Sequence, residues 1–219
     1  TKFYAFLKED GIKGIFQTVF SVCRAQTFKL ENALEDVDLN KCLVECLTLL
    51  TRLSGHQEFY SLFSENVTYL INEVCLPLMR ITESEIDKFK YNPQEYVQLA
   101  LDTCDKQASK TAKTQAAQLL EYLCDNIDGA LTHTVNTVMS VIDCSISCTE
   151  LEQIPIKYPI LKQLVNTIFF SQTDAIVKIE TSLLILSLLS YLVIQRDDLK
   201  LTLEKMLSNY ADFFTGEST

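Results

Sequence analysis

Apolar residues recur at three- and four-residue spacing along almost the whole chain, and few turn-forming residues interrupt them. This spacing gathers apolar side chains on one face of a helix, whereas a half-buried strand would alternate them. Only 5 Gly and 4 Pro occur among 219 residues, too few for the many tight turns of an all-β fold. The pattern therefore predicts an all-α fold.

The apolar periodicity divides into consecutive helices joined by short turns. The predicted helices are Ile12–Phe28, Leu39–Leu53, Glu58–Phe63, Asn66–Met79, a helix from Pro93, Lys110–Ile127, Ala130–Ile146, Ile160–Phe170, Asp174–Gln195 and Asp198–Phe214. Helix pairs of this size recur at roughly 40 residues, which is the period of HEAT and armadillo units. We therefore predict a right-handed superhelical solenoid of HEAT/ARM-like helix pairs over residues 1–219, with a closed helical bundle as the alternative.

Single residues mark the predicted helix ends. Gly55 is expected to cap the helix before it, and Pro77 to kink or end the helix that contains it. Asn92 is a natural N-cap before Pro93, and Asp128-Gly129 separates two helices. Asp174 and Asp197 are two further predicted N-caps. Residues 150–159, with two prolines, are interpreted as a linker.

Charge and hydropathy narrow the partners. The net charge is −10, and no cluster of Lys and Arg exists that could neutralise phosphates, so no direct nucleic-acid binding is expected. An acidic balance suits a solvated surface or a basic partner. The uncharged run from Thr181 to Gln195 is too short to span a bilayer comfortably, so no membrane insertion is expected.

No catalytic, cofactor or metal motif stands out. The eight Cys lie mostly among apolar helix positions, which indicates small packing residues in a reducing compartment. Cys42 and Cys46 are four residues apart, as are Cys144 and Cys148, but no group of about four ligands forms around either pair. There is no Gly-x-Ser-x-Gly elbow and no Walker motif, so we expect neither an enzyme nor a cofactor.

The clearest candidate for a binding site is an acidic insertion and linking helix at residues 80–108. Its candidate partner-binding residues, with two further acids, are Glu83, Glu85, Asp87, Lys88, Lys90, Glu95, Asp102 and Asp105. Such a segment could steer a basic partner by charge complementarity, or it could simply be a solvated insertion. Two Phe pairs, Phe169-Phe170 and Phe213-Phe214, either pack between helices or line a groove for partner phenylalanines.

The order of motifs from Phe59 to Leu123 carries a family resemblance. The motifs are Phe59–Phe63, Val74–Leu78 with its late Pro, Glu83–Lys90, Asn92-Pro93-Gln94-Glu95-Tyr96, and the Ala116-Ala117 helix at Thr114–Leu123. This order resembles the middle of the importin-β superfamily of nuclear transport receptors, most closely the group of the CAS exportin. The likeness is best between Leu43 and Leu131.

The resemblance implies a function and its partners. It implies a central segment of a longer receptor that carries protein cargo through the nuclear pore. The partners it implies are Ran in its GTP form, importin-α or another protein cargo, and FG nucleoporins. It also implies shuttling between nucleus and cytoplasm. Val97–Cys104 lacks the Arg residues usual in that family segment, so a cargo importin stays open, as does a HEAT-repeat scaffold without Ran dependence.

Overall fold

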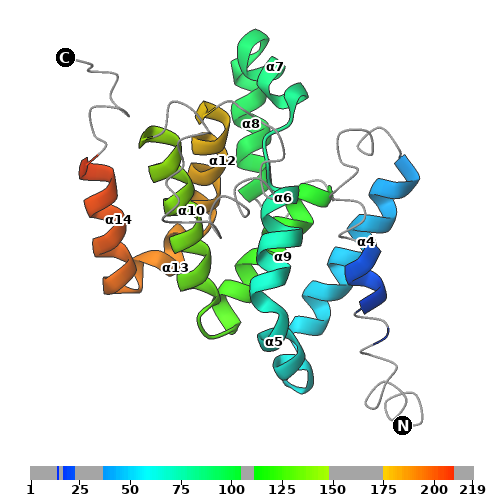
Figure 1. Ribbon diagram of the computed structural model, residues 1–219. Helices are drawn as coiled ribbons and strands as arrows, with labels where there is room; N and C mark the ends of the chain where they lie inside the picture. The colour runs from blue at the N-terminus through cyan, green and yellow to red at the C-terminus, as the bar shows by residue number, and fades with distance from the viewer. Residues whose placement is uncertain (1–13, 15–16, 23–36, 105–110, 148–174, 210–219) are drawn as a thin grey trace, which may run out of the picture. The chain divides into compact units, whose positions relative to one another are not determined.

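A computed structural model describes residues 14, 17–22, 37–104, 111–147 and 175–209 (Figure 1). Every regular element in these ranges is a helix, so the predicted all-α class is confirmed. The predicted linker at 150–159, the predicted helix at 160–170 and most of the one at 12–28 lie outside the described residues. So does the predicted N-cap Asp174. The chain divides into two compact units, residues 1–123 and 124–219.

The first long helix of the first unit is α4, Val37–Ser54, which contains the predicted helix Leu39–Leu53. Leu43, Leu47 and Leu50 recur at helical spacing and are almost completely buried. The helix ends just before Gly55, as predicted, but Gly55 does not adopt the left-handed conformation of a usual glycine cap. Instead, the His56 N–H donates to the Leu53 carbonyl at 3.0 Å and closes the helix end.

A single long helical segment replaces the two helices predicted between Glu58 and Met79. After the short 3-10 turn η2 (Gln57–Phe59), helix α5 (Tyr60–Leu70) continues through the π-helical turn η3 (Ile71–Cys75) into α6 (Leu76–Leu78). The predicted break before Asn66 is wrong. The predicted effect of Pro77 is confirmed. Pro has no N–H to continue the helix, and α6 ends one residue after it, at Leu78. The wider π turn η3 immediately precedes α6.

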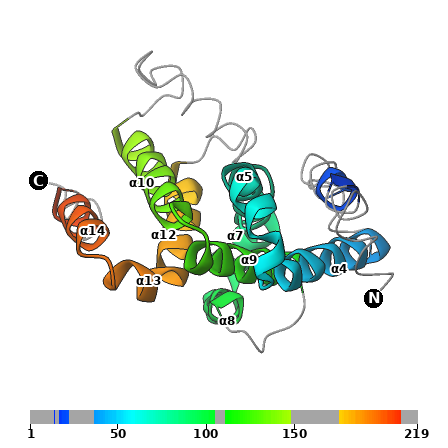
Figure 2. The ribbon, with the colours of Figure 1, turned by 90° about the horizontal axis from the view of Figure 1, so that it is seen from below.

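The core of this unit forms where α9, Ala112–Asn126, meets the earlier helices (Figure 2). The fully buried apolar residues of α9 within this unit are Ala116, Ala117, Leu119, Leu120 and Leu123. The two Ala allow close helix packing, and the Thr48 hydroxyl of α4 lies 2.8 Å from Gln115 Oε1 of α9. The predicted helix at Lys110–Ile127 is therefore confirmed, with ends shifted by one or two residues.

The second unit is built on α10, Ala130–Ser147, which begins after Gly129 as predicted. Both α12 (Ala175–Leu188) and α14 (Asp197–Asn209) pack against α10, and the short α13 (Ser190–Ile194) joins them (Figure 1). The predicted helix Asp174–Gln195 is interrupted at Leu189. The prediction that Asp197 is an N-cap is wrong, because Asp197 is already the first helical residue of α14.

Apolar residues of α14 lie on both its exposed and its buried side. Leu201 and Leu207 are exposed, as is Ile194 at the end of α13, whereas Leu199 and Met206 are buried. Among the helices of the described ranges, none combines the length and the apolarity that crossing a membrane requires.

Candidate partner-binding site

The predicted insertion at residues 80–108 folds as a helical hairpin. Helix α7 (Glu83–Tyr91) and helix α8 (Pro93–Cys104) are separated by Asn92 and pack against each other (Figure 1). We refer to α7, Asn92 and α8 as the hairpin. It carries all the candidate binding residues named from the sequence except Asp105, which lies outside the described residues.

A reciprocal cap fixes the start of α7. The Thr82 hydroxyl accepts a hydrogen bond from the Glu85 N–H at 3.3 Å, and the Glu85 carboxylate accepts one from the Thr82 N–H at 2.7 Å. This capping box satisfies two backbone donors that a helix start leaves without helical partners. The sequence analysis missed it, although Thr82 followed three residues later by Glu85 is a readable signal for such a cap.

An Asn cap opens α8, where the sequence predicted it, and here Glu95 accepts from the side-chain amide of the cap residue. Asn92 Oδ1 accepts from the Glu95 N–H at 3.4 Å, and Asn92 Nδ2 donates to Glu95 Oε2 at 3.0 Å. Pro93 occupies the first helical position, where a missing N–H costs nothing. The sequence predicts that this helix buries Tyr96, Val97 and Leu99 or Ala100. For Val97 this is wrong, because its side chain is 55% exposed.

Two ion pairs hold the hairpin. Lys88 Nζ lies 3.0 Å from Glu95 Oε1 and ties α7 to α8, with the two side chains 38% and 49% exposed. Lys113 Nζ, from α9, lies 2.6 Å from Glu85 Oε1, and these side chains are only 16% and 20% exposed. The same Lys113 ammonium donates to the Arg80 carbonyl at 3.3 Å.

The environment of Glu85 keeps its carboxylate charged. Burial by itself raises the pKa of Glu85, because it disfavours the ionised form. The Lys113 ammonium and the hydrogen bonds from Lys113 and Thr82 outweigh burial, so the pKa is lowered below its ordinary value. Glu85 is thus an ionised structural group that is already engaged by its neighbours.

The hairpin therefore offers fewer uncommitted acids to a partner than the candidate residues named from the sequence suggested. Glu85 and Glu95 serve as cap and ion-pair partners, whereas Asp87 and Lys90 are exposed. The side chains of Glu83 and Asp102 lie outside the described residues. Tyr91, which the sequence analysis did not single out, is 85% exposed at the end of α7.

The described cysteines are placed as packing residues or at helix surfaces. Cys42 is exposed and Cys46 half-buried on α4; burial first, then neighbouring Cys42 and Glu45, raise the pKa of Cys46 to about 11. Burial likewise raises the pKa of Cys124 to about 12. Both thiols are protonated at neutral pH and are poor nucleophiles.

Metal ligands do not converge in the described part of the chain. No group of three or more His, Cys, Asp and Glu side chains close enough to hold a metal ion occurs there. Cys148 lies outside this part. Of the two histidines, His133 is half-buried, and burial lowers its pKa.

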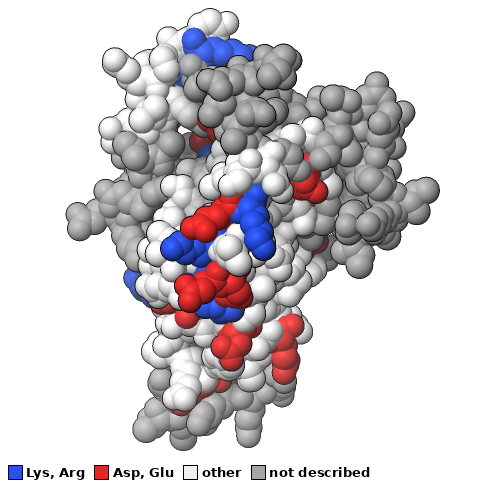
Figure 3. All heavy atoms as spheres, turned by 90° about the vertical axis from the view of Figure 1, so that its left-hand side faces the viewer, with Lys and Arg blue, Asp and Glu red and all other residues white. Residues whose placement is uncertain are grey.

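Charges of both signs share the surface near α14. Arg196 pairs with Asp198 at 3.2 Å, and Lys200 lies 3.9 Å from Glu204 one helical turn on. Basic and acidic side chains are accordingly intermixed on the face of the molecule seen in Figure 3. Among the described residues near α14, the charges are thus paired locally rather than gathered in a patch of one sign.

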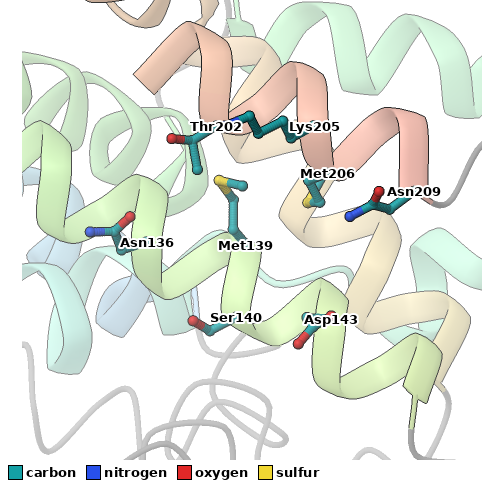
Figure 4. A pocket seen from close by; sticks show the side chains of 8 residues that line it. All are labelled: Asn136, Met139, Ser140, Asp143, Thr202, Lys205, Met206 and Asn209. Carbon is teal, nitrogen blue, oxygen red and sulfur yellow. The ribbon is translucent and has the colours of Figure 1, made fainter. Parts of the chain in front are cut away.

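An open groove of about 400 Å³ lies between α10 and α14 in the second unit (Figure 4). Met139 and Met206 supply its apolar surface, and the other lining residues are polar: Asn136, Ser140, Asp143, Thr202, Lys205 and Asn209. The predicted Phe pairs 169–170 and 213–214 lie outside the described residues.

Helical packing throughout the described ranges, together with a capped hairpin between α6 and α9, fits the class that the motif order indicated, the importin-β superfamily. The comparison with family models is more specific: the Cse1 model matches residues 9–152, about two-thirds of the chain. The chain therefore belongs to the Cse1 family, the CAS-like group of that superfamily.

The family match contains α4 through α10 and hence the whole hairpin, whereas α12, α13 and α14 follow it. The best-resembling stretch identified in the sequence, Leu43–Leu131, lies wholly inside it. No curated protein and no solved structure matched the chain.

Proposed function

We propose that this chain is a segment of a CAS-type exportin, a receptor that returns importin-α from the nucleus together with Ran in its GTP form. The observation that carries the proposal is the Cse1 family match over residues 9–152. The helix pairs are proposed to stack as a right-handed HEAT-like solenoid, and the chain to be a carrier with no enzymatic activity. On this proposal the receptor shuttles between nucleus and cytoplasm by contacts with FG nucleoporins.

The proposed mechanism is linkage between two ligands. An exportin must bind cargo more tightly when Ran-GTP is also bound, and linkage requires that cargo strengthen Ran-GTP binding by the same factor. A stack of helix pairs suits this role, since small rotations at each repeat add up to a large change of curvature. The release step then follows from hydrolysis of GTP on Ran, with no chemistry on this chain.

The hairpin is the proposed contact to a basic patch on a partner protein. Asp87 is exposed on it and is free of the capping and ion-pair roles that engage Glu85 and Glu95. An exposed acid at an interface rim acts mainly on the rate of encounter. Asp87→Lys should slow association at low salt, whereas Asp125→Lys, which reverses an exposed acid at the end of α9, should leave it unchanged. Equal association rates for the two variants would mean that the hairpin is not part of the interface.

The proposal as a whole is tested by binding to Ran loaded with GTP or with GDP, at physiological salt. Both the present chain and the longer receptor would be measured, because the Ran contacts could extend beyond these residues. Binding of the receptor to the GTP form only supports a Ran-dependent receptor. No binding of the receptor to either form contradicts the proposal and favours a scaffold.

A further inference from the structure

The hairpin joins the rest of its unit through the turn at residues 79–82 and through a contact with α9. Among the described helices, the closest packing of α7 is against α8. Lys113, which is 28 residues after Glu85, reaches back from the first turn of α9 to the first turn of α7. Its ammonium thus joins α9 both to the hairpin, through Glu85, and to the entering turn, through the Arg80 carbonyl.

The Lys113–Glu85 pair is shielded, unlike the Lys88–Glu95 pair. Its side chains are 16% and 20% exposed, against 38% and 49% for Lys88 and Glu95. Exposed ion pairs contribute little to the stability of a fold, because water and salt screen the attraction between their charges. Removing one partner of a shielded pair costs more, because the remaining charge is left without compensation in a poorly solvated position.

The hairpin is also braced internally so that it can move as one piece. The Thr82–Glu85 capping box stiffens the first turn of α7, and the Asn92–Glu95 cap with the Lys88–Glu95 pair ties α8 to α7. Ile81, only 2% exposed, anchors the entering turn in the core. A capped hairpin with a buried entering turn and a shielded ion pair to α9 has the parts of a latch.

We propose that Lys113 is the latch that fixes the α7–α8 hairpin against α9, and that loss of its contact with Glu85 frees the start of α7 from α9. The latch positions Asp87, Lys90 and Tyr91 relative to α9. The latch proposal depends only on contacts within this chain. It can therefore be tested independently of the proposal that Ran and importin-α are partners.

The test is hydrogen exchange of the 219-residue chain, read separately for the α7 amides 86–91 and the α9 amides 119–123. Lys113→Met removes the ammonium and keeps a side chain of similar length. Glu85→Gln removes the charge but keeps a capping-box acceptor, because Gln serves at that position as Glu does. The double variant completes a cycle, and Lys88→Met is the matched control at the exposed pair.

A latch predicts that Lys113→Met speeds exchange of the α7 amides by about tenfold or more and leaves the α9 amides within about twofold. In the double variant, exchange of the α7 amides should be no faster than in the more affected single variant, because Lys113→Met and Glu85→Gln remove the same interaction. Lys88→Met should change α7 exchange by less than about fivefold.

Three outcomes overturn the proposal. Unchanged α7 exchange in Lys113→Met means that the pair fastens nothing. Equal acceleration of α7 and α9 amides means that Lys113 braces the whole unit rather than the hairpin. Additive effects of Lys113→Met and Glu85→Gln mean that the two residues act independently.

Discussion

Replacing Gly129 by Ala should destabilise the second unit for one isolated reason, the backbone conformation. Gly129 has φ +80°, and a Cβ added there would meet nothing within 4 Å. Steric contact therefore contributes nothing to the change. A left-handed conformation costs an L-residue about 1–2 kcal/mol, while Ala restricts the unfolded chain and returns about 0.4–1 kcal/mol. The net loss is about 1 kcal/mol.

The turn cannot relax to escape this cost, because both of its flanks are buried. Ile127 and Ala130 are 4% and 0% exposed, and the Gly129 carbonyl accepts the first hydrogen bond of α10 from His133 at 2.9 Å. We expect urea unfolding, with exchange of the α10 amides as the local readout, to give the stability order Gly, Asn, Ala at this position. Asn should fall between the other two because it tolerates the left-handed region better than Ala.

Gly14 is the matched control for this prediction. A Cβ at Gly14 also meets nothing within 4 Å, but this residue is helical and lacks the positive φ. Gly14→Ala should therefore leave stability unchanged or raise it. The reasoning is refuted if Gly129→Ala is as stable as the parent chain, or if Asn at 129 is as harmful as Ala.

Three further changes test other parts of the fold. Thr82→Ala should remove the α7 cap and lower the stability of that helix by about 1 kcal/mol. The measurement is hydrogen exchange of the α7 amides, which should become faster; unchanged exchange would mean that the cap does not stabilise α7. Phe63→Ala, at a side chain 1% exposed, should cost about 3–5 kcal/mol in urea unfolding because it opens a core cavity. A loss of unfolding free energy below about 1 kcal/mol would mean that the neighbouring side chains close the cavity left by Phe63. The lowered pKa of Glu85 adds stability that is present above its ordinary value of 4.5 and lost as the pH falls through its folded value. The stability gap between the parent chain and Glu85→Gln should thus narrow from neutral to acidic pH, and a gap that stays constant would contradict this.

The helical class and most helix positions followed from the sequence, since apolar spacing and caps are local signals. Val37–Ser54 and Ala130–Ser147 match their predictions closely because each carries a clear apolar stripe and a polar turn beside it. Gly129 and Asn92 were read correctly, because their roles depend on two or three neighbouring residues. The break predicted near Asn66 failed, since tertiary packing of Phe63, Leu70 and Ile71 carries one helix through that point.

That residues 80–108 bind a partner stays a prediction, and the contacts within this segment did not follow from the sequence. Counting acids at 80–108 located the hairpin, whereas the assignment of Glu85 to structure depends on Lys113, which no local pattern connects to it. The exposure of Val97 and Tyr91 likewise depends on how α8 packs on α7, which a sequence period cannot fix. Only the Thr82–Glu85 cap could have been read from spacing and was missed.

The measurement that tests the central claim most directly is the affinity of the receptor for Ran-GTP with and without importin-α. A CAS-type exportin predicts that importin-α tightens Ran-GTP binding, and that Ran-GTP tightens importin-α binding by the same factor. Ran-GTP affinity that importin-α leaves unchanged would contradict the claim and favour a receptor for other cargo.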